Sequence, residues 1–133
     1  MKLITRDTDY AVRAITYLAK EEKEVVSVSE LTLALKTPRA FLRKLLQTLN
    51  KEKILKSHKG VGGGFSLRKN PDDIYVVDLM RIFQGPLKLN ECFLRKVRCP
   101  RRSTCILRKK ISVLEEYVIK ELKSITVASL LLR

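Results

Sequence analysis

Long apolar runs and a hydrophobic leader are both missing from this sequence. No run approaches the roughly 20 apolar residues that a membrane-spanning helix needs. Residues 1–20 contain Arg6, Asp7, Asp9 and Arg13, so they do not form the apolar core of a secretory signal peptide. We therefore expect a cytoplasmic protein with no membrane partner.

Acidic residues are scarce. The 14 acids face 28 basic residues, which gives a formal net charge of +14, and such a chain attracts nucleic acid or an anionic membrane. The imbalance is strongest between Leu31 and Pro71, where ten Lys or Arg residues accompany the single acid Glu52. Because a solvated helix usually mixes both signs, this one-sided excess predicts a polyanionic partner.

The sequence also lacks the residue sets of common enzymes. It has no nucleophile–base–acid set and no nucleotide-binding fingerprint, so we do not expect an enzyme. It has three cysteines, an odd number, which argues against a disulfide framework in a reducing compartment. With 133 residues, 45% of them hydrophobic, the chain has the length and the apolar content of one domain.

Residues 39–51 form the segment around which the rest is organised. At helical spacing, one side is apolar and the other is basic or amide-bearing with no carboxylate. Arg, Gln and Asn can bond base edges when a helix enters the major groove. The polar side therefore predicts a DNA-reading helix, with a soluble basic helix as the plainer alternative; its candidate DNA contacts are Arg39, Arg43, Lys44, Gln47 and Asn50.

The neighbours of this segment favour DNA binding. Residues 27–35 form a short apolar-periodic segment, and Pro38 ends one helix and starts the next, as in a helix-turn-helix. Residues 54–58 and 65–68 resemble strands joined by the glycine-rich tip 60–64. We interpret this hairpin as a wing, with a flexible turn as the alternative, and expect DNA contacts from Lys56, Lys59, Gly62, Gly63 and Gly64.

Three further helices are predicted. The first spans 8–21 with Thr8 or Asp7 as its cap, the next spans about 76–84, and the last runs from about 106 to 123 with an apolar stripe that needs a partner. The predicted fold is mainly α with a small β-hairpin wing: a winged helix-turn-helix plus a long C-terminal helix. We expect a DNA-binding domain at 1–85, a cysteine loop at 86–105 and a C-terminal segment at 106–133.

All three cysteines, Cys92, Cys99 and Cys105, lie in one short loop segment. Eight Lys or Arg residues and no acid lie between positions 95 and 110, a field that favours thiolates and offsets the charge of an iron–sulfur cluster. Structural zinc sites commonly use closely spaced pairs with a fourth Cys or His, and neither is present. The loop alone leaves an iron–sulfur cluster, zinc and plain burial of reduced thiols open.

Several segments together resemble the IscR/NsrR family of winged-helix transcription regulators. They are residues 1–3, 9–14, the wing 60–65, 85–87, the three cysteines and 124–130. The resemblance implies an iron–sulfur cluster on Cys92, Cys99 and Cys105, and a C-terminal helix that dimerises by crossing its twin and packing on the other subunit's DNA-binding domain. Two symmetry-related recognition helices then match an inverted-repeat operator in double-stranded DNA.

The resemblance also bears on the fourth ligand. Members with a two-iron cluster have a histidine where this chain has Arg108, whereas the nitric-oxide-sensing branch completes a four-iron cluster with an aspartate near the partner's amino terminus. Asp9 occupies that place, so the resemblance implies [4Fe-4S] over [2Fe-2S], with Asp7 and Glu91 as substitutes. Six residues separate Cys92 and Cys99 where better-known members have five.

The sequence thus predicts a homodimeric DNA-binding regulator whose operator affinity depends on an iron–sulfur cluster that senses nitric oxide, oxygen or iron–sulfur status. A cluster-free regulator of the same family, controlled by thiol oxidation or a partner protein, is the first alternative. A redox enzyme or electron carrier is the second, and it leaves the basic helix face unexplained.

Overall fold

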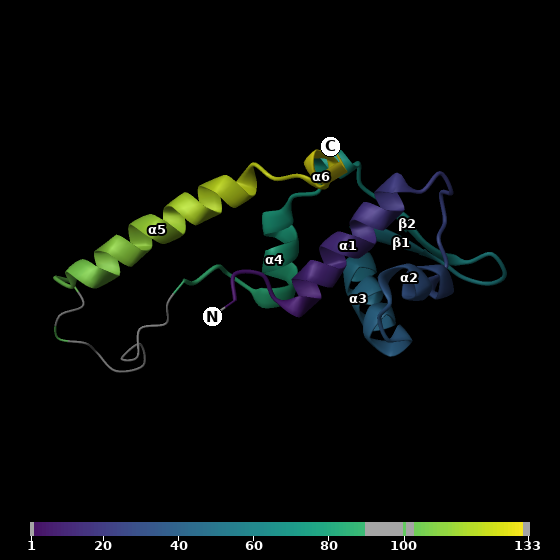
Figure 1. The fold of residues 1–133 in the computed structure, drawn as a ribbon, viewed down its shortest axis with the longest axis horizontal. Coiled ribbons are helices and arrows are strands. Elements are labelled where there is room, and N and C mark those ends of the chain that lie inside the picture. Colours follow the sequence, from purple (N-terminus) through teal and green to yellow (C-terminus); the bar gives the residue numbers. More distant parts are fainter. Residues whose placement is uncertain (1, 90–99, 101–102, 132–133) are drawn as a thin grey trace.

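The computed structural model describes residues 2–89, 100 and 103–131. Within them the chain forms helices, one two-stranded antiparallel sheet and a short 3₁₀ turn (Figure 1). The elements are α1 (Arg6–Lys20), α2 (Val28–Leu35), α3 (Arg39–Lys51), β1 (Leu55–His58), β2 (Gly64–Leu67), η1 (Pro71–Asp73), α4 (Val76–Gln84), α5 (Ile106–Lys123) and α6 (Val127–Leu131). This is the predicted winged helix-turn-helix with a long C-terminal helix.

The core lies where α1, α2 and α3 meet the hairpin. The apolar side of α3 is buried as its periodicity predicts, and it packs with the apolar sides of α1 and α2. The fully buried side chains include Ile15, Leu31, Leu42, Leu46 and Leu49. At roughly 1.5–3 kcal/mol for each fully buried aliphatic side chain, this cluster holds the three helices in one arrangement.

The start of α1 differs from the prediction. Thr5, and neither Asp7 nor Thr8, is its N-cap, and Thr5 Oγ1 accepts a hydrogen bond from the backbone N–H of Thr8 at 3.4 Å. Thr8 is fully buried, so its hydroxyl lies inside the fold instead of at the helix end. The helix therefore begins at Arg6, two residues before the predicted start.

The hairpin pairs β1 with β2 in the register Leu55↔Leu67 to His58↔Gly64. Val26 joins it through a bridge to Phe65, where each residue's N–H donates to the other's carbonyl, at 3.0 and 2.9 Å. The hairpin is thus held to the segment that leads into α2.

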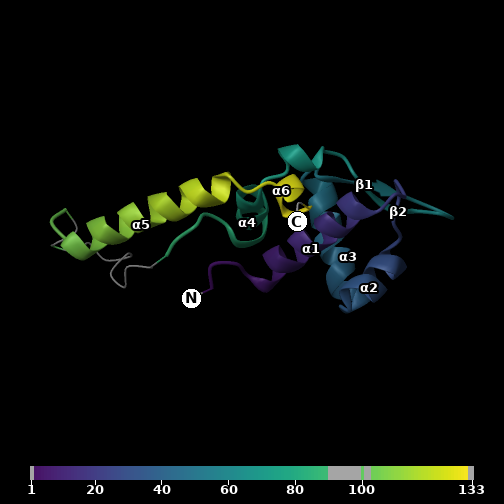
Figure 2. The ribbon, with the colours of Figure 1, turned by 45° about the horizontal axis from the view of Figure 1, so that its top comes forward.

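The C-terminal half leaves the body and returns to it. α4 packs against α1, and α5 contacts α4 near its own C-terminal end, where Leu122 is buried with Val76 and Met80. The rest of α5 extends away from the other elements, as Figures 1 and 2 both show. The chain then turns back, and α6 lies against α1 and η1 with Val127 fully buried.

The helix α6 was not predicted. Its docking is fixed by backbone hydrogen bonds to the segment before α4: Val76 N–H donates to Ile125 O at 3.0 Å, and Val127 N–H donates to Ile74 O at 2.8 Å. In the part of the chain that the structure describes, no helix is both long and apolar enough to cross a membrane.

Candidate nucleic-acid interface and cysteine loop

The turn between α2 and α3 is the corner of the helix-turn-helix. Ser27 caps α2 by accepting the N–H of Glu30 at 3.1 Å, and Lys36 ends the helix in the left-handed region with φ of 49°. Pro38 precedes the first residue of α3, where its missing N–H costs nothing because a helix start has no acceptor for it. The turn therefore leaves the polar side of α3 at the protein surface.

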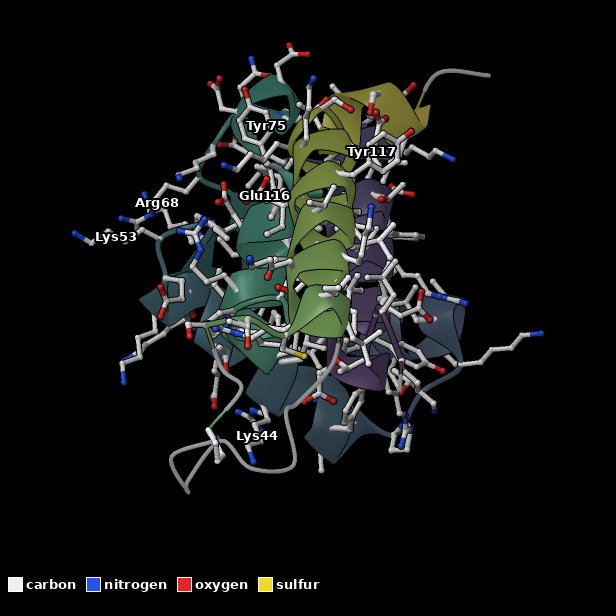
Figure 3. All side chains as sticks on the ribbon, turned by 90° about the vertical axis from the view of Figure 1, so that its left-hand side faces the viewer. Lys44, Lys53, Arg68, Tyr75, Glu116 and Tyr117 are labelled. Atoms are coloured by element: carbon white, nitrogen blue, oxygen red, sulfur yellow. The ribbon has the colours of Figure 1, made fainter. Side chains whose placement is uncertain are left out.

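The polar side of α3 is exposed and keeps its charge. Arg43, Lys44 and Gln47 are all exposed, and Lys44 projects outward from the α3 end of the molecule (Figure 3). The ion pairs between described residues are Arg13–Asp9, Lys23–Glu30 and Arg81–Asp78, and none of them includes a basic residue of α3. The protein's own acids therefore leave this positive face open to an anionic partner.

Two of the predicted contact residues also make hydrogen bonds within the fold. Arg39 Nη1 donates to Ser29 Oγ at 3.0 Å, which braces the start of α3 against α2. Asn50 Oδ1 accepts the backbone N–H of Ser57 at 3.3 Å, which ties the end of α3 to the first strand of the wing. Both residues thus help to fix the angle between the recognition helix and its neighbours.

Glu30, the single acid of α2, is paired with groups of the protein itself. Glu30 accepts from Lys23 Nζ at 2.9 Å and from the Tyr17 hydroxyl at 3.4 Å, which joins α2 to α1 and the connection after it. The hydrogen bond and the negative charge of Glu30 raise the pKa of Lys23 above its ordinary value of 10.5. The carboxylate is therefore occupied by Lys23 and Tyr17, and α2 adds no unpaired negative charge beside the basic face of α3.

The wing carries exposed lysines and a glycine tip whose members have different roles. Lys56 and Lys59 are exposed, and so are Gly62 and the apolar tip residue Val61. A Cβ on Gly63 would lie 2.3 Å from the His58 carbonyl oxygen, and one on Gly64 would lie 2.1 Å from that of Val26. The hairpin itself therefore requires glycine at 63 and 64, whereas Gly62 has open space around it.

His58 is the one histidine of the chain. Its Nε2 and Ser66 Oγ are 2.8 Å apart across the two strands, and the ring is half-buried. This hydrogen bond gives the ring a role inside the hairpin.

The cysteine loop is described only at its end. Cys92 and Cys99, and the substitute ligand Glu91, lie outside the described residues. Cys105 is half-buried and occupies the N-cap of α5. The first turn of α5 has no acid. Within residues 2–89, 100 and 103–131, no three His, Cys, Asp or Glu side chains come together as a metal site.

Asp9 lies in the first turn of α1, with its side chain about half exposed. Its Oδ2 accepts a hydrogen bond from Arg13 Nε at 3.1 Å, one turn further along the helix. Cys105 caps the N-terminal end of α5, and that end of the helix lies far from α1 in both ribbon views (Figures 1 and 2). Asp9 and Cys105 of one chain are therefore not brought together within that chain.

The side of α5 that faces away from α4 is apolar and uncovered. Tyr117 is 63% exposed and Val113 62%, and Figure 3 shows Tyr117 and Glu116 projecting from different sides of the helix. At 100° per residue, the uncovered apolar residues form one stripe: Ile106, Leu107, Val113, Leu114 and Tyr117. Such a stripe on a charged helix marks an interaction surface.

Sequence reasoning missed the contacts of Gln84. Its Oε1 accepts from Thr8 Oγ1 at 2.8 Å and from Thr5 N–H at 3.1 Å, and its Nε2 donates to Leu3 O at 2.9 Å. The last residue of α4 thereby holds the first turn of α1, which carries Asp9. A single glutamine before Gly85 gives no local signal of these partners, which are about 80 residues away in the sequence.

The chain is similar to known transcriptional regulators. The chain matches the model of the Rrf2 family, described as iron-dependent transcriptional regulators, over residues 4–133. It is 30% identical over 134 residues to the HTH-type transcriptional regulator NsrR of Shouchella clausii, with 90% of this chain and 87% of that protein covered. It is 34% identical over 124 residues to a candidate HTH-type transcriptional regulator of Aquifex aeolicus, with 92% and 86% covered.

Solved structures share the fold. IscR of T. potens is 28% identical and superposes with a TM-score of 0.68, over 98% of this chain and 86% of that one. CymR, the global cysteine regulator of B. subtilis, is 23% identical with a TM-score of 0.77, over 98% of this chain and 97% of that one. At 23% identity the likeness to CymR concerns the fold alone.

Proposed function

Because the chain belongs to the Rrf2 family, and is accordingly a transcriptional regulator and not an enzyme, we propose that it binds an inverted-repeat operator as a homodimer whose affinity depends on an iron–sulfur cluster. Residues 1–85 would bind DNA, 86–105 would hold the cluster and 106–133 would pair the subunits. The protein would act in the cytoplasm.

The observation that carries DNA binding is the unneutralised face of α3 beside the wing. Arg43, Lys44 and Gln47 are exposed at the centre of that face, where a helix in the major groove meets base edges. Arg39 and Asn50, at its margin, would set the angle of the helix and contact the groove. From the wing, Lys56, Lys59 and Gly62 would lie along the phosphate backbone, and Gly63 and Gly64 would shape the tip that approaches it.

The uncovered stripe of α5 supports a homodimer. Its apolar residues have no cover from described parts of their own chain, and a second copy offers an identical stripe that can cover them across a twofold axis. α6 docks on its own domain, so the free length of α5 is what remains to pair. In the proposed dimer, α5 would also pack on the other subunit's DNA-binding domain.

The donors present fit an iron–sulfur cluster. Cys105 lies at the N-terminus of α5, just before Arg108, Lys109 and Lys110, whose positive charge would offset that of a cluster, and Cys92 and Cys99 would complete the sulfur ligands. The cluster, with [4Fe-4S] favoured over [2Fe-2S], would supply iron that reacts with nitric oxide or oxygen. An oxygen ligand is a weaker and more exchangeable partner for this iron than sulfur.

The fourth ligand would be Asp9 of the partner subunit. Within one chain the end of α5 that Cys105 caps lies far from α1, so a second subunit would have to bring its α1 to Cys105. Asp9 must leave Arg13 to reach iron, and an exposed ion pair at this spacing contributes only about 0.3–0.5 kcal/mol. Exchange of the carboxylate between Arg13 and iron is therefore energetically easy, and it would couple the cluster to the position of α1.

A cluster-free regulator is the second candidate. The Asp9–Arg13 ion pair favours it, because that carboxylate already has a partner without a metal. Its control would come from thiol oxidation or from a partner protein.

Two measurements test the proposal. Protein purified without air should be brown and contain about four iron and four sulfide per subunit, as in a cubane. Its visible absorbance should bleach with nitric oxide or oxygen. A colourless, iron-free protein after reconstitution would support the cluster-free candidate. For DNA binding, Arg43→Ala should weaken binding by an amount that depends on the base sequence, whereas Lys59→Ala should weaken binding to every duplex equally.

A further inference from the structure

Arg6, the first residue of α1, reaches across to the recognition helix. Its guanidinium carbon lies 4.6 Å from the ring centroid of Phe41 on α3 and 5.7 Å from that of Tyr10 on α1. The two rings meet edge to face, with centroids 5.5 Å apart and an interplanar angle of 83°. The aromatic pair is partly buried against the core, so it forms a fixed platform for an exposed cation.

Neither helix stability nor ion pairing explains a cation at this position. The positive end of the helix dipole disfavours Arg in the first turn, where acids are preferred. Asp9, one of the two acids of that turn, pairs with Arg13, and the ion pairs between described residues do not include Arg6. The positive charge of Arg6 therefore remains available to a further partner.

The position of Phe41 tells which side of the recognition helix Arg6 occupies. Phe41 and Asn50 are nine residues apart, which at about 100° per residue places them on opposite sides of α3. Asn50 is bonded to the wing at Ser57, and Lys44 lies on the exposed arc next to Phe41. Arg6 therefore flanks the DNA-facing arc of α3 on the side away from the wing.

We propose that Arg6 binds a backbone phosphate of the operator, on the flank of the major groove opposite the one that the wing contacts. A helix in the major groove lies between two phosphate backbones, and the wing serves only one of them. A guanidinium held flat on aromatic rings keeps its N–H edges free for the bidentate geometry that phosphate prefers. Arg6 and the wing would then hold α3 from both sides and fix its depth and tilt.

This inference rests on the proposed function, because it requires that the chain bind duplex DNA. The test compares the full-length wild type with Arg6→Met, which keeps a long apolar stem on Phe41 and removes the charge. Lys20→Met is the matched control, since Lys20 is exposed at the other end of the same helix. The probes are duplexes of roughly 30 base pairs, long enough for two half-sites one helical turn apart: one of mixed sequence and one selected from a random pool.

Affinity is measured by fluorescence anisotropy over a series of salt concentrations. Arg6→Met should weaken binding to both duplexes by the same factor, about 3- to 10-fold, and should lower the slope of log affinity against log salt by about 0.9 for each subunit. The melting temperature of Arg6→Met should equal that of the wild type. The salt slope of Lys20→Met should also equal that of the wild type.

Three results would overturn the assignment. They are a slope unchanged by Arg6→Met, a loss restricted to the selected duplex, and a lower melting temperature with an unchanged slope, which would make Arg6 a brace between α1 and α3 only. If the wild type binds neither duplex, the proposed function fails with it. If the wild type binds and only the Arg6 result is negative, the proposed function stands without this contact.

Discussion

Gln84 Oε1 lies 2.8 Å from the hydroxyl of Thr8, a fully buried residue 76 positions earlier in the sequence. The contact joins the end of α4 to the first turn of α1. That turn carries the proposed ligand Asp9 and the proposed phosphate contact Arg6, whereas α4 leads into the cysteine loop. One side chain thus connects the two parts of the molecule on which regulation would depend.

Removal of the Gln84 side chain should destabilise the fold. Gln84→Ala takes away the 2.8 Å acceptor of the buried Thr8 hydroxyl, which keeps only the Thr5 hydroxyl at 3.2 Å, and it removes the acceptor of Thr5 N–H. Each lost hydrogen bond contributes about 0.5–1.5 kcal/mol. Urea unfolding measures the loss. In a Thr8→Val background the same substitution should cost less, because the hydroxyl is no longer there; full additivity of the two changes would contradict the contact.

The glycine tip offers a matched pair of substitutions. Gly64→Ala should cost about 2–4 kcal/mol, because its Cβ would lie 2.1 Å from the backbone carbonyl oxygen of Val26. Gly62 has a positive φ of 78°, but a Cβ added there would have no atom within 4 Å. Gly62→Ala should therefore lower the free energy of unfolding by about 1–2 kcal/mol. Urea unfolding of both variants gives the comparison, and equal losses would be incompatible with the tight packing at Gly64.

Asp9→Ala should weaken the hold on the cluster. Without the carboxylate, the protein prepared anaerobically should contain less iron and sulfide and lose its visible absorbance faster in air than the wild type. Asp7→Ala, an exposed acid in the same turn, is the control. If Asp7→Ala has the larger effect, the ligand is Asp7; if neither variant differs from the wild type, neither aspartate is the ligand.

A charge on the apolar stripe of α5 should separate the subunits. Val113→Glu places a carboxylate where a second copy would bury an apolar side chain, so the variant should sediment as a monomer at concentrations where the wild type is a dimer. Ser112→Glu adds the same charge at an exposed position one residue away, off the stripe, and should remain dimeric. A dimer that survives Val113→Glu would place the interface elsewhere.

Local pattern was sufficient for most of the elements. The helices at 39–51, 76–84 and 106–123 begin and end at the predicted residues, because their apolar residues recur at helical spacing and turn residues bound them. The start of α1 was predicted two residues late, with Thr8 or Asp7 as its cap, because no local pattern shows that Thr8 is buried against Gln84. The five-residue α6 is too short to show a helical period.

By itself the sequence determined which surfaces could matter: a helix with one apolar and one acid-free basic side, a glycine-tipped hairpin, a cluster of three cysteines and a last helix with an uncovered stripe. Each is a local pattern of residue types, so neighbours along the chain suffice to detect it. The tertiary structure decided how these surfaces relate. Contacts between residues far apart in sequence place Arg6 beside Phe41, join Gln84 to α1 and hold the backbone of Gly64 against that of Val26. No local pattern encodes such distances, because they depend on how the helices pack.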